Sequence, residues 1–384
     1  MAALARACAF LAALMIAVCL DGRHAYAEIV LTDAAGREVR LAAPARRIVA
    51  NDSLLLLSLA LIDPDPVARI AGWAGPQRID KGMYASFRKR FPQIDAVPVV
   101  GAVSPSNASP ESILSVQPDL FVVSLWQPGW ETVTELLEGA GVRVIFLDGP
   151  TNAKRDPAEA TAFSIELLGT AIGRRPKAVE YADFVRARYR SVTDRLRNVE
   201  ERPSVLVDAF AGTECCSTPG RDNRLTQNIE LAGGKIVGAE RIAGYEGRLN
   251  PESVLAIDPD IYIGTGGPHL AAQGGLVLGG GFDAVTARAS LSAVLSQGIR
   301  RNLTAGREGR AFAVSHQLSI SALSVLTFEC FAKWTHPELF ADLDPTQTLA
   351  EINRRFLAVP LEGTFWIGLR TDEEAGAENR NGHP

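Results

Sequence analysis

The sequence has few of the side chains that build catalytic metal centres. It contains five histidines and five cysteines in 384 residues, and no two histidines, nor a histidine and a carboxylate, stand at a spacing typical of a zinc site. It also lacks the G-x-S-x-G elbow, the H-E-x-x-H and C-x-x-C motifs, the P-loop and a G-x-G-x-x-G turn that opens a helix. These absences predict a protein that is not an enzyme and that needs no metal ion or cofactor of its own.

The sequence also lacks an excess of basic residues. Its formal net charge is −5, with 39 Lys and Arg against 44 Asp and Glu, so there is no basic field to attract nucleic acid. The composition, 47% hydrophobic and 22% charged, is that of a soluble globular protein. A chain of 384 residues is too long for one ordinary core and fits two domains.

The one long hydrophobic run, from Ala7 to Leu20, is too short to span a bilayer comfortably. It follows Arg6 and precedes the small-residue site Ala25-Tyr26-Ala27, so we predict that residues 1–27 are a cleaved secretory signal peptide. Lipidation at Cys19 is disfavoured because the preceding valine is bulky. The mature chain keeps three cysteines (Cys215, Cys216 and Cys330); a disulfide is expected in an oxidising compartment, and spacing leaves the pairing open.

One segment occurs twice. "PESILSVQPDL" (Pro110–Leu120) and "PESVLAIDPDI" (Pro251–Ile261) are identical at six of eleven positions. Each copy predicts a capped helix with Pro at its first position, a Pro-Asp stop and a strand. The helix must run antiparallel to that strand, so Glu111 and Glu252 are expected near the strand ends where α/β ligand sites form. A glutamate in a first turn also complements the helix dipole.

The repeat predicts a duplicated α/β protein. We expect an N-terminal lobe over residues 28–155, a connecting helical segment over 156–201, a C-terminal lobe over 202–369 and a disordered polar tail over 370–384. Each lobe is predicted to be Rossmann-like. Beyond Pro176, apolar residues recur every three or four positions, which predicts an amphipathic helix of about 26 residues and ~39 Å that joins the lobes rigidly.

Several aromatic residues follow predicted strands, where α/β proteins place their ligands. Although the commoner place for one tryptophan is a core, their shared location predicts a ligand cleft lined by Trp73, Trp126, Trp130 and Phe210. Arginines in nearby loops (Arg78, Arg221, Arg224 and Arg248) could together grip an anion. His316, after the strand "RAFAV", is a further candidate contact, and Tyr84 or Tyr245 could ligate haem iron. The run "LGGGFDAV" is predicted to be a mobile loop.

The two lobes, the helical connection, the two PES segments, "LLGTAIGRRPKA" and "QNIELAGG" (Gln227–Gly234) together resemble the periplasmic substrate-binding proteins of ABC importers for ferric siderophores, haem and cobalamin. The resemblance extends from about Pro44 to Phe356. It implies a monomer in the periplasm that binds its ligand between the lobes and closes little. It also implies that Glu111 and Glu252 form salt bridges with arginines of a dimeric membrane permease.

The resemblance favours a ferric siderophore as ligand, since arginines and tryptophans suit a large anionic chelate. Haem is the second candidate and cobalamin the third. A chelatase-like enzyme is an alternative from a different class, but it needs an acidic residue opposite His316 across the cleft, and none is evident. A sensory domain is disfavoured because no signalling segment follows.

Overall fold

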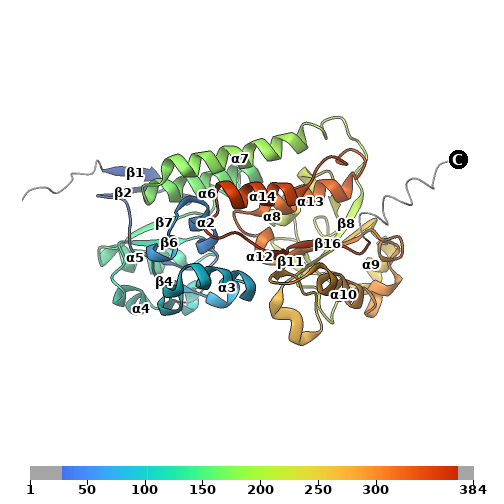
Figure 1. Ribbon diagram of the computed structural model, residues 1–384, viewed down its shortest axis with the longest axis horizontal. Helices are drawn as coiled ribbons and strands as arrows, with labels where there is room; N and C mark the ends of the chain where they lie inside the picture. The colour runs from blue at the N-terminus through green and yellow to red at the C-terminus, as the bar shows by residue number, and fades with distance from the viewer. Residues whose placement is uncertain (1–27, 102, 126, 371–384) are drawn as a thin grey trace, which may run out of the picture.

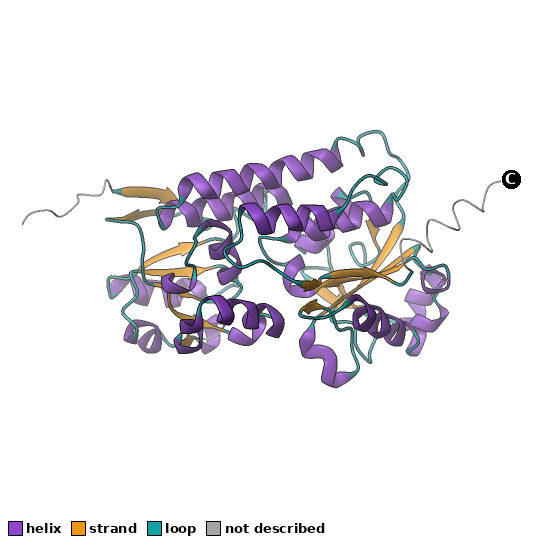
Figure 2. Cartoon of the chain, viewed as in Figure 1, coloured by secondary structure: helices purple, strands orange, loops and turns teal. Residues whose placement is uncertain are grey.

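A computed structural model describes residues 28–101, 103–125 and 127–370. The predicted signal peptide, Trp126 and the predicted tail from residue 371 onward lie outside the described residues. In the described part, two α/β lobes lie side by side, with helices packed around a sheet in each (Figures 1 and 2). No helix in this part is long and apolar enough to cross a membrane.

The N-terminal lobe contains a five-stranded sheet in which every pair of strands is parallel. In spatial order its strands are β5 (Val99–Gly101), β4 (Ile70–Ala74), β3 (Ile48–Ala50), β6 (Leu120–Val123) and β7 (Arg143–Phe146). Its helices are α2 (Leu55–Ile62), α3 (Lys81–Arg90), α4 (Pro110–Ser115) and α5 (Trp130–Gly139). A hairpin of β1 (Ile29–Thr32) and β2 (Glu38–Leu41) precedes the sheet.

The C-terminal lobe has a similar sheet with one antiparallel edge strand. In spatial order its strands are β10 (Lys235–Ile236), β8 (Ser204–Asp208), β12 (Ile261–Gly266), β14 (Ala311–Ser315) and β16 (Trp366–Gly368). Two small ribbons pair β9 (Ser217–Pro219) with β11 (Glu246–Arg248) and β13 (Gly279–Gly280) with β15 (Gly363–Thr364). Its helices are α8 (Arg224–Leu231), α9 (Pro251–Ile257), α10 (Ala284–Leu295), α11 (Thr304–Arg307), α12 (His316–Ser319), α13 (Ser324–Thr335) and α14 (Pro345–Arg355).

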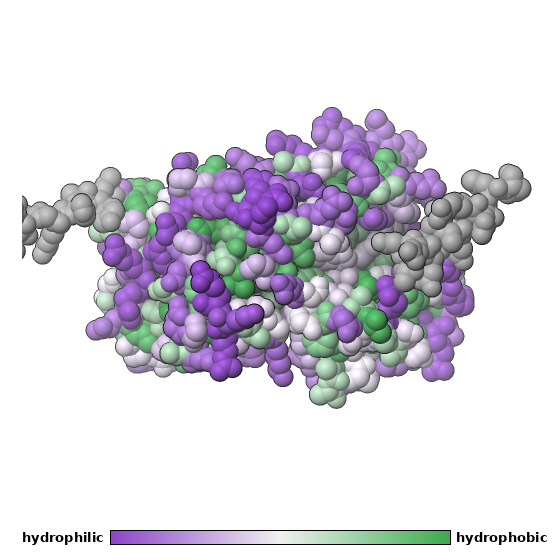
Figure 3. Space-filling view, viewed as in Figure 1, coloured by the Kyte–Doolittle hydropathy of each residue, from purple (hydrophilic) through white to green (hydrophobic). Residues whose placement is uncertain are grey.

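Helices α6 (Pro157–Ala171) and α7 (Arg175–Thr193) connect the lobes, and α7 runs above both of them (Figure 1). Asp156 caps α6 by accepting a hydrogen bond from the Glu159 amide at 3.1 Å. The turn between the helices uses Gly173 at φ +73°, a conformation that favours glycine. One face of α7 is buried, whereas its outer face belongs to the mostly hydrophilic ridge in Figure 3.

The connecting helix is shorter than predicted. It has 19 residues and ends at Thr193, because the chain turns there towards β8. The turn is held by the ion pair between Arg195 and Asp342 at 2.6 Å and by Leu196, which packs into the core. Apolar residues of both lobes and of α6 and α7 form one continuous core, so the lobes share buried surface along this connection.

The two repeated segments form equivalent structures. Ser109 and Asn250 cap α4 and α9, and proline opens both helices. The aspartates of the two Pro-Asp stops also have matching partners: Asp119 accepts the Arg47 amide at 2.9 Å, and Asp260 accepts the Ser204 amide at 2.7 Å. Asp119 therefore links the start of β6 to the start of β3, and Asp260 links the start of β12 to the start of β8.

Candidate functional site

A cavity of about 220 Å³, open to solvent, lies between the lobes. Its N-terminal side is formed where β3, β6 and β7 end, its floor is formed by α6, and its C-terminal side is formed by loops around α8 and before α13. Parallel α/β sheets place ligands at these strand ends. Its polar lining includes Asp52, Ser58, Arg78, Ser124, Asp148, Asn152, Thr161, Ser164, Asn223, Arg224, Tyr245, Ser319, Ser321 and Ser324.

Arg78 is held on the N-terminal wall of the cavity. Its Nε lies 3.0 Å from Oδ1 of the buried Asp52, and the side chain of Arg78 is 31% exposed. The same Asp52 oxygen accepts the Leu54 amide at 3.1 Å, so the carboxylate also fixes the start of α2. This arrangement orients the guanidinium at the wall while leaving part of it in contact with solvent.

Arg224, the first residue of α8, reaches from the C-terminal lobe to the segment that precedes α6. Its Nη1 donates to the Arg155 carbonyl and to Gln227 Oε1, both at 2.8 Å, and its Nη2 donates to the Asn152 carbonyl at 3.1 Å. Burial lowers the pKa of Arg224, and the nearby Asp148 carboxylate opposes that shift. Three of the five N–H groups of the guanidinium are used in these bonds.

Tyr245 lines the cavity beside α8 and is 56% exposed. Its carbonyl accepts hydrogen bonds from the Gly220 amide at 2.9 Å and from Asn223 Nδ2 at 3.2 Å. These bonds hold the loop in place, so the phenol is presented to the cavity by a fixed backbone.

His316 belongs to an aromatic cluster at the ends of β8, β12 and β14. Its ring centroid lies 3.9 Å from that of Phe210, and the Phe210 ring lies 5.8 Å from that of His269. His316 Nδ1 is 3.2 Å from the Thr265 hydroxyl. Burial, with the positive charge of Arg78 and a contribution from His269, lowers the pKa of His316 to about 3. The imidazole is therefore neutral at physiological pH.

The two lobes also touch where α3 meets β13. Asp80, which is 3% exposed, accepts the Met83 amide at 2.8 Å and the Gly280 amide of the other lobe at 2.6 Å. Burial raises the pKa of Asp80, while these amide hydrogen bonds oppose the shift. The "LGGGFDAV" segment is thus paired with β15 and fixed across the lobes, which corrects the prediction of a mobile loop.

Comparison with known proteins places this architecture in a family. A family model described as periplasmic binding protein matches residues 60–317. This chain belongs to the periplasmic binding protein family. Comparison with curated protein sequences found no match.

Solved structures show the same two-lobed fold as this periplasmic binding protein. A TroA-like periplasmic binding protein, FepB from Veillonella parvula, is 25% identical with a TM-score of 0.78, covering 89% of this chain and 100% of its own. Haemophilus influenzae MolA, bound to molybdate, is 16% identical with a TM-score of 0.67 and covers 87% and 99%. A protein of an Fe3+-hydroxamate transport system from Saccharomonospora viridis is 20% identical with a TM-score of 0.53 and covers 79% and 98%.

The binding-protein structure brings only some of the predicted ligand contacts together. Arg224 and Tyr245 line the cavity, as does Arg78. Phe210, which is 43% exposed, and His316 form the neighbouring cluster described above. Arg221 is exposed and does not line the cavity, although it stands only three residues before Arg224.

Two predicted tryptophan contacts are core residues instead. Trp73 is 2% exposed and Trp130 is fully buried, because their side chains point into the N-terminal lobe and pack in two apolar clusters. Tyr84 does not line the cavity either, since it lies on α3 and its hydroxyl donates to Asp95 at 3.0 Å. Glu111 and Glu252 are exposed and also lie outside the cavity lining, which corrects the expectation that they point at the ligand site.

The polar residues that the sequence analysis missed come from loop ends. Asp148 stands two residues after the end of β7 and Asn152 lies four residues later, and both line the cavity. Their position just after a predicted strand was the available signal, since polar residues at the carboxyl end of a parallel strand are candidates for ligand contacts.

Proposed function

We propose that this periplasmic binding protein captures a ferric siderophore between its lobes in the periplasm and delivers it to the permease of an ABC importer. The observation that carries the proposal is the pair of arginines, Arg78 and Arg224, on opposite sides of one solvent-open cavity. Both are oriented by other groups: Arg78 by Asp52, and Arg224 by three hydrogen bonds to the Arg155 and Asn152 carbonyls and to Gln227. Such an arrangement suits an anionic chelate that is gripped from both lobes.

The size of the cavity supports a ligand that is only partly enclosed. Its volume of about 220 Å³ is below the roughly 300–1,000 Å³ typical of small-molecule sites. A chelate of siderophore size would therefore extend into the opening or separate the lobes at the contact between Asp80 and Gly280. The serine hydroxyls on the C-terminal side, at positions 319, 321 and 324, could accompany the arginines in binding oxygen atoms of the chelate.

Haem is the second candidate, and the position of Tyr245 favours it. The phenol lines the cavity and could ligate a haem iron, whereas Tyr84 is engaged with Asp95 outside the cavity. Cobalamin follows as a third candidate of the same importer class. A chelatase-like activity has less support. It needs a carboxylate opposite His316, whereas the charged side chain that acts on His316 is the cation Arg78.

The test is tryptophan fluorescence of the purified mature protein, titrated separately with ferric hydroxamate, catecholate and citrate complexes, haemin and cobalamin. Saturable quenching by one ferric siderophore, and not by its metal-free form, is the expected result. If haemin alone saturates, the haem proposal replaces it, and if no compound binds, the proposal of an iron-complex importer is wrong.

A matched pair of variants tests the site itself. Arg224→Gln should weaken binding of the ferric complex about 10- to 100-fold, since a hydrogen bond to a charged group contributes about 1.5–3 kcal/mol. Arg221→Gln removes the same charge three residues away, outside the cavity, and should leave the affinity unchanged. Equal losses in the two variants would indicate a general charge effect and would contradict the assigned site. Thermal denaturation of both variants checks that each remains folded.

A further inference from the structure

Cys215 and Cys216 are neighbours in the chain and form a disulfide in the loop between β8 and β9. A disulfide stabilises a fold mainly by closing a loop of the unfolded chain, and the effect grows with loop length. A bond between adjacent residues closes almost no loop, so this disulfide contributes little as a structural staple. The remaining cysteine among the described residues, Cys330, is buried in α13 and is not part of the pair.

A buried carboxylate lies beside the two sulfur atoms. Asp208, at the end of β8, is fully buried, and one of its oxygens and the two Sγ atoms lie within 4.8 Å of one another. Its Oδ2 accepts hydrogen bonds at 2.7 Å from the Tyr262 hydroxyl and from Arg300 Nε. Its Oδ1 is buried with no hydrogen-bond partner. A buried oxygen without a partner is costly and calls for an explanation.

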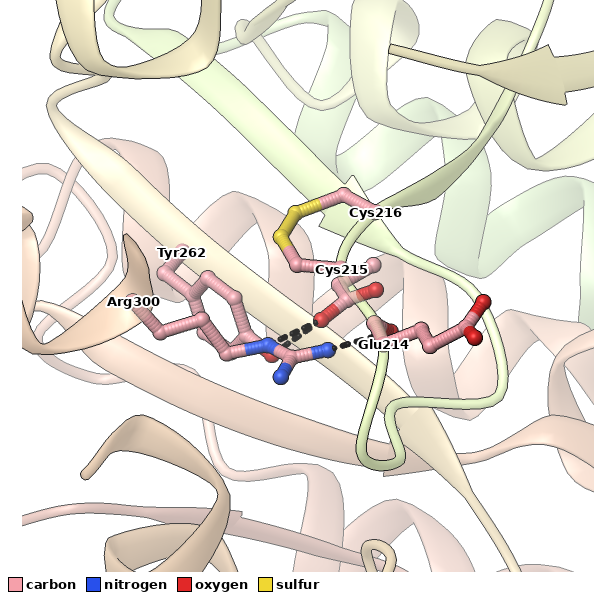
Figure 4. Close-up of a disulfide and its surroundings, with 6 residues drawn as sticks. Glu214, Cys215, Cys216, Tyr262 and Arg300 are labelled. Atoms are coloured by element: carbon pink, nitrogen blue, oxygen red, sulfur yellow. Dashed lines mark hydrogen bonds and ion pairs between the residues drawn. A yellow bond between two sulfur atoms is a disulfide. The ribbon is translucent and has the colours of Figure 1, made fainter. Parts of the chain in front are cut away.

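Tyr262 and Arg300 hold the carboxylate in one orientation. Arg300 is itself buried and also donates through Nη2 to the Glu214 carbonyl at 2.8 Å, which anchors the loop just before the cysteines (Figure 4). Ligands of protein-bound metals are characteristically oriented by such outer hydrogen bonds. One carboxylate oxygen is therefore fixed by its neighbours, and the other is left available.

The charges of the group change with the state of the disulfide. When the sulfurs are bonded, Asp208 and Arg300 form a neutral pair at 2.7 Å. Two thiolates would add two negative charges beside this pair, and Arg248, whose charge also acts on Asp208, is already paired with Glu214. One divalent cation would restore neutrality, and thiolates prefer soft, thiophilic metals.

We propose that Cys215, Cys216 and Asp208 form a site for one thiophilic divalent cation, such as Zn2+ or Cd2+, once the disulfide is reduced. A dithiol reductant supplies two electrons and two protons to the S–S bond and becomes a disulfide itself. The cation then displaces two protons as two metal–sulfur bonds form, and Asp208 Oδ1 supplies a third ligand. Water completes the coordination.

The ion can reach the site from solvent on the side of Cys215, which is half-buried. This site lies outside the cavity lining and does not depend on the proposed function.

Cadmium titration of the protein tests the proposal, because thiolate-to-cadmium charge transfer gives an ultraviolet absorbance. The protein is reduced with a dithiol, freed of reductant without oxygen, and titrated with Cd2+. We expect one Cd2+ per chain in the reduced protein and no such band in the oxidised protein. A disulfide that the dithiol cannot reduce in the folded protein, or reduced protein without the band, would overturn the proposal.

Four variants assign the ligands. Cys215→Ser should abolish the band, and Asp208→Asn should weaken Cd2+ binding about 10-fold or more, by comparison with the loss of outer-shell partners. Glu214→Gln changes a neighbouring exposed carboxylate and Cys330→Ala removes the buried cysteine, and both should bind as the wild type does. Unchanged Cd2+ binding by Cys215→Ser or Asp208→Asn would contradict the proposed site.

If Asp208→Asn does not fold, a crystal of reduced wild-type protein soaked in Cd2+ decides the question. An ion bonded to Asp208 Oδ1 supports the proposal, and an ion elsewhere overturns it.

Discussion

Asp80 of the N-terminal lobe accepts a hydrogen bond from the amide of Gly280 in the C-terminal lobe, at 2.6 Å and across 200 residues of sequence. The carboxylate also caps α3 through the Met83 amide. The lobes are also joined along the α6–α7 connection, by the hydrogen bonds of Arg224 to Asn152 and Arg155, and by the Ala358 amide, which donates to the Ala60 carbonyl at 2.9 Å.

Replacing Gly82 by alanine should force this contact apart. A Cβ at Gly82 would lie 1.8 Å from the Gly280 carbonyl oxygen, a backbone atom that cannot move without moving β13. We expect a larger radius of gyration in small-angle X-ray scattering and a lower melting temperature. Gly139→Ala is the matched control, since nothing lies within 4 Å of its Cβ and it also lies in a helix. An unchanged radius of gyration and melting temperature in Gly82→Ala would contradict the close contact between Gly82 and Gly280 in solution.

Removing the carboxylate tests the same contact through its hydrogen bonds. Asp80→Ala should cost about 1–3 kcal/mol of unfolding free energy, because it leaves the buried Gly280 amide unpaired and removes a helix cap. Asp283→Ala removes another capping aspartate, which accepts the Thr286 amide at 2.7 Å and is exposed. Urea denaturation should show the smaller loss, about 1 kcal/mol, for Asp283→Ala. Equal losses would mean that only the cap at Asp80 matters.

The sequence predicted those features that depend on neighbouring residues. The caps and prolines of α4 and α9 follow from local hydrogen bonding, so the repeated segments were predicted correctly. Helix α3 and strand β5 were missed, because α3 buries only Met83 and Phe87 and β5 has three residues, which leaves almost no periodic pattern.

Whether a side chain points into the core or into the cavity was harder to predict. Trp73 and Trp130 stand at or beyond strand ends, as ligand contacts do, but packing turns both into the core. Arg221 and Arg224 stand three residues apart, and the sequence gives no reason to choose between them as ligand contacts. The hydrogen bonds of Arg224 to the Asn152 and Arg155 carbonyls hold its side chain at the cavity. Contacts between distant segments, such as Asp80 with Gly280, leave no signal in one sequence.

The lowered pKa of His316 predicts how stability changes with pH. The folded protein keeps this ring neutral down to a pKa of about 3, whereas the unfolded chain protonates it near pH 6.5. The unfolded state therefore binds more protons as pH falls from about 6.5 towards 3, and this group's contribution to stability is lost over that range. His316→Gln should make unfolding free energy less dependent on pH between 7 and 4. Ring 15N shifts should show neutral His316 at pH 4.5, and a charged ring there would contradict the burial argument.

The positions of Glu111 and Glu252 predict a transport defect without a binding defect. Both are exposed in the first turns of equivalent helices, one in each lobe, which suits a two-point contact with arginines of a dimeric permease. The double variant Glu111→Lys, Glu252→Lys should abolish uptake of the iron complex in cells while the purified protein keeps its ligand affinity. The double variant Glu135→Lys, Glu230→Lys reverses one exposed charge in each lobe elsewhere and should transport normally. Loss of uptake in both would indicate a general charge effect, and loss of ligand affinity in the first would place the glutamates in ligand binding instead.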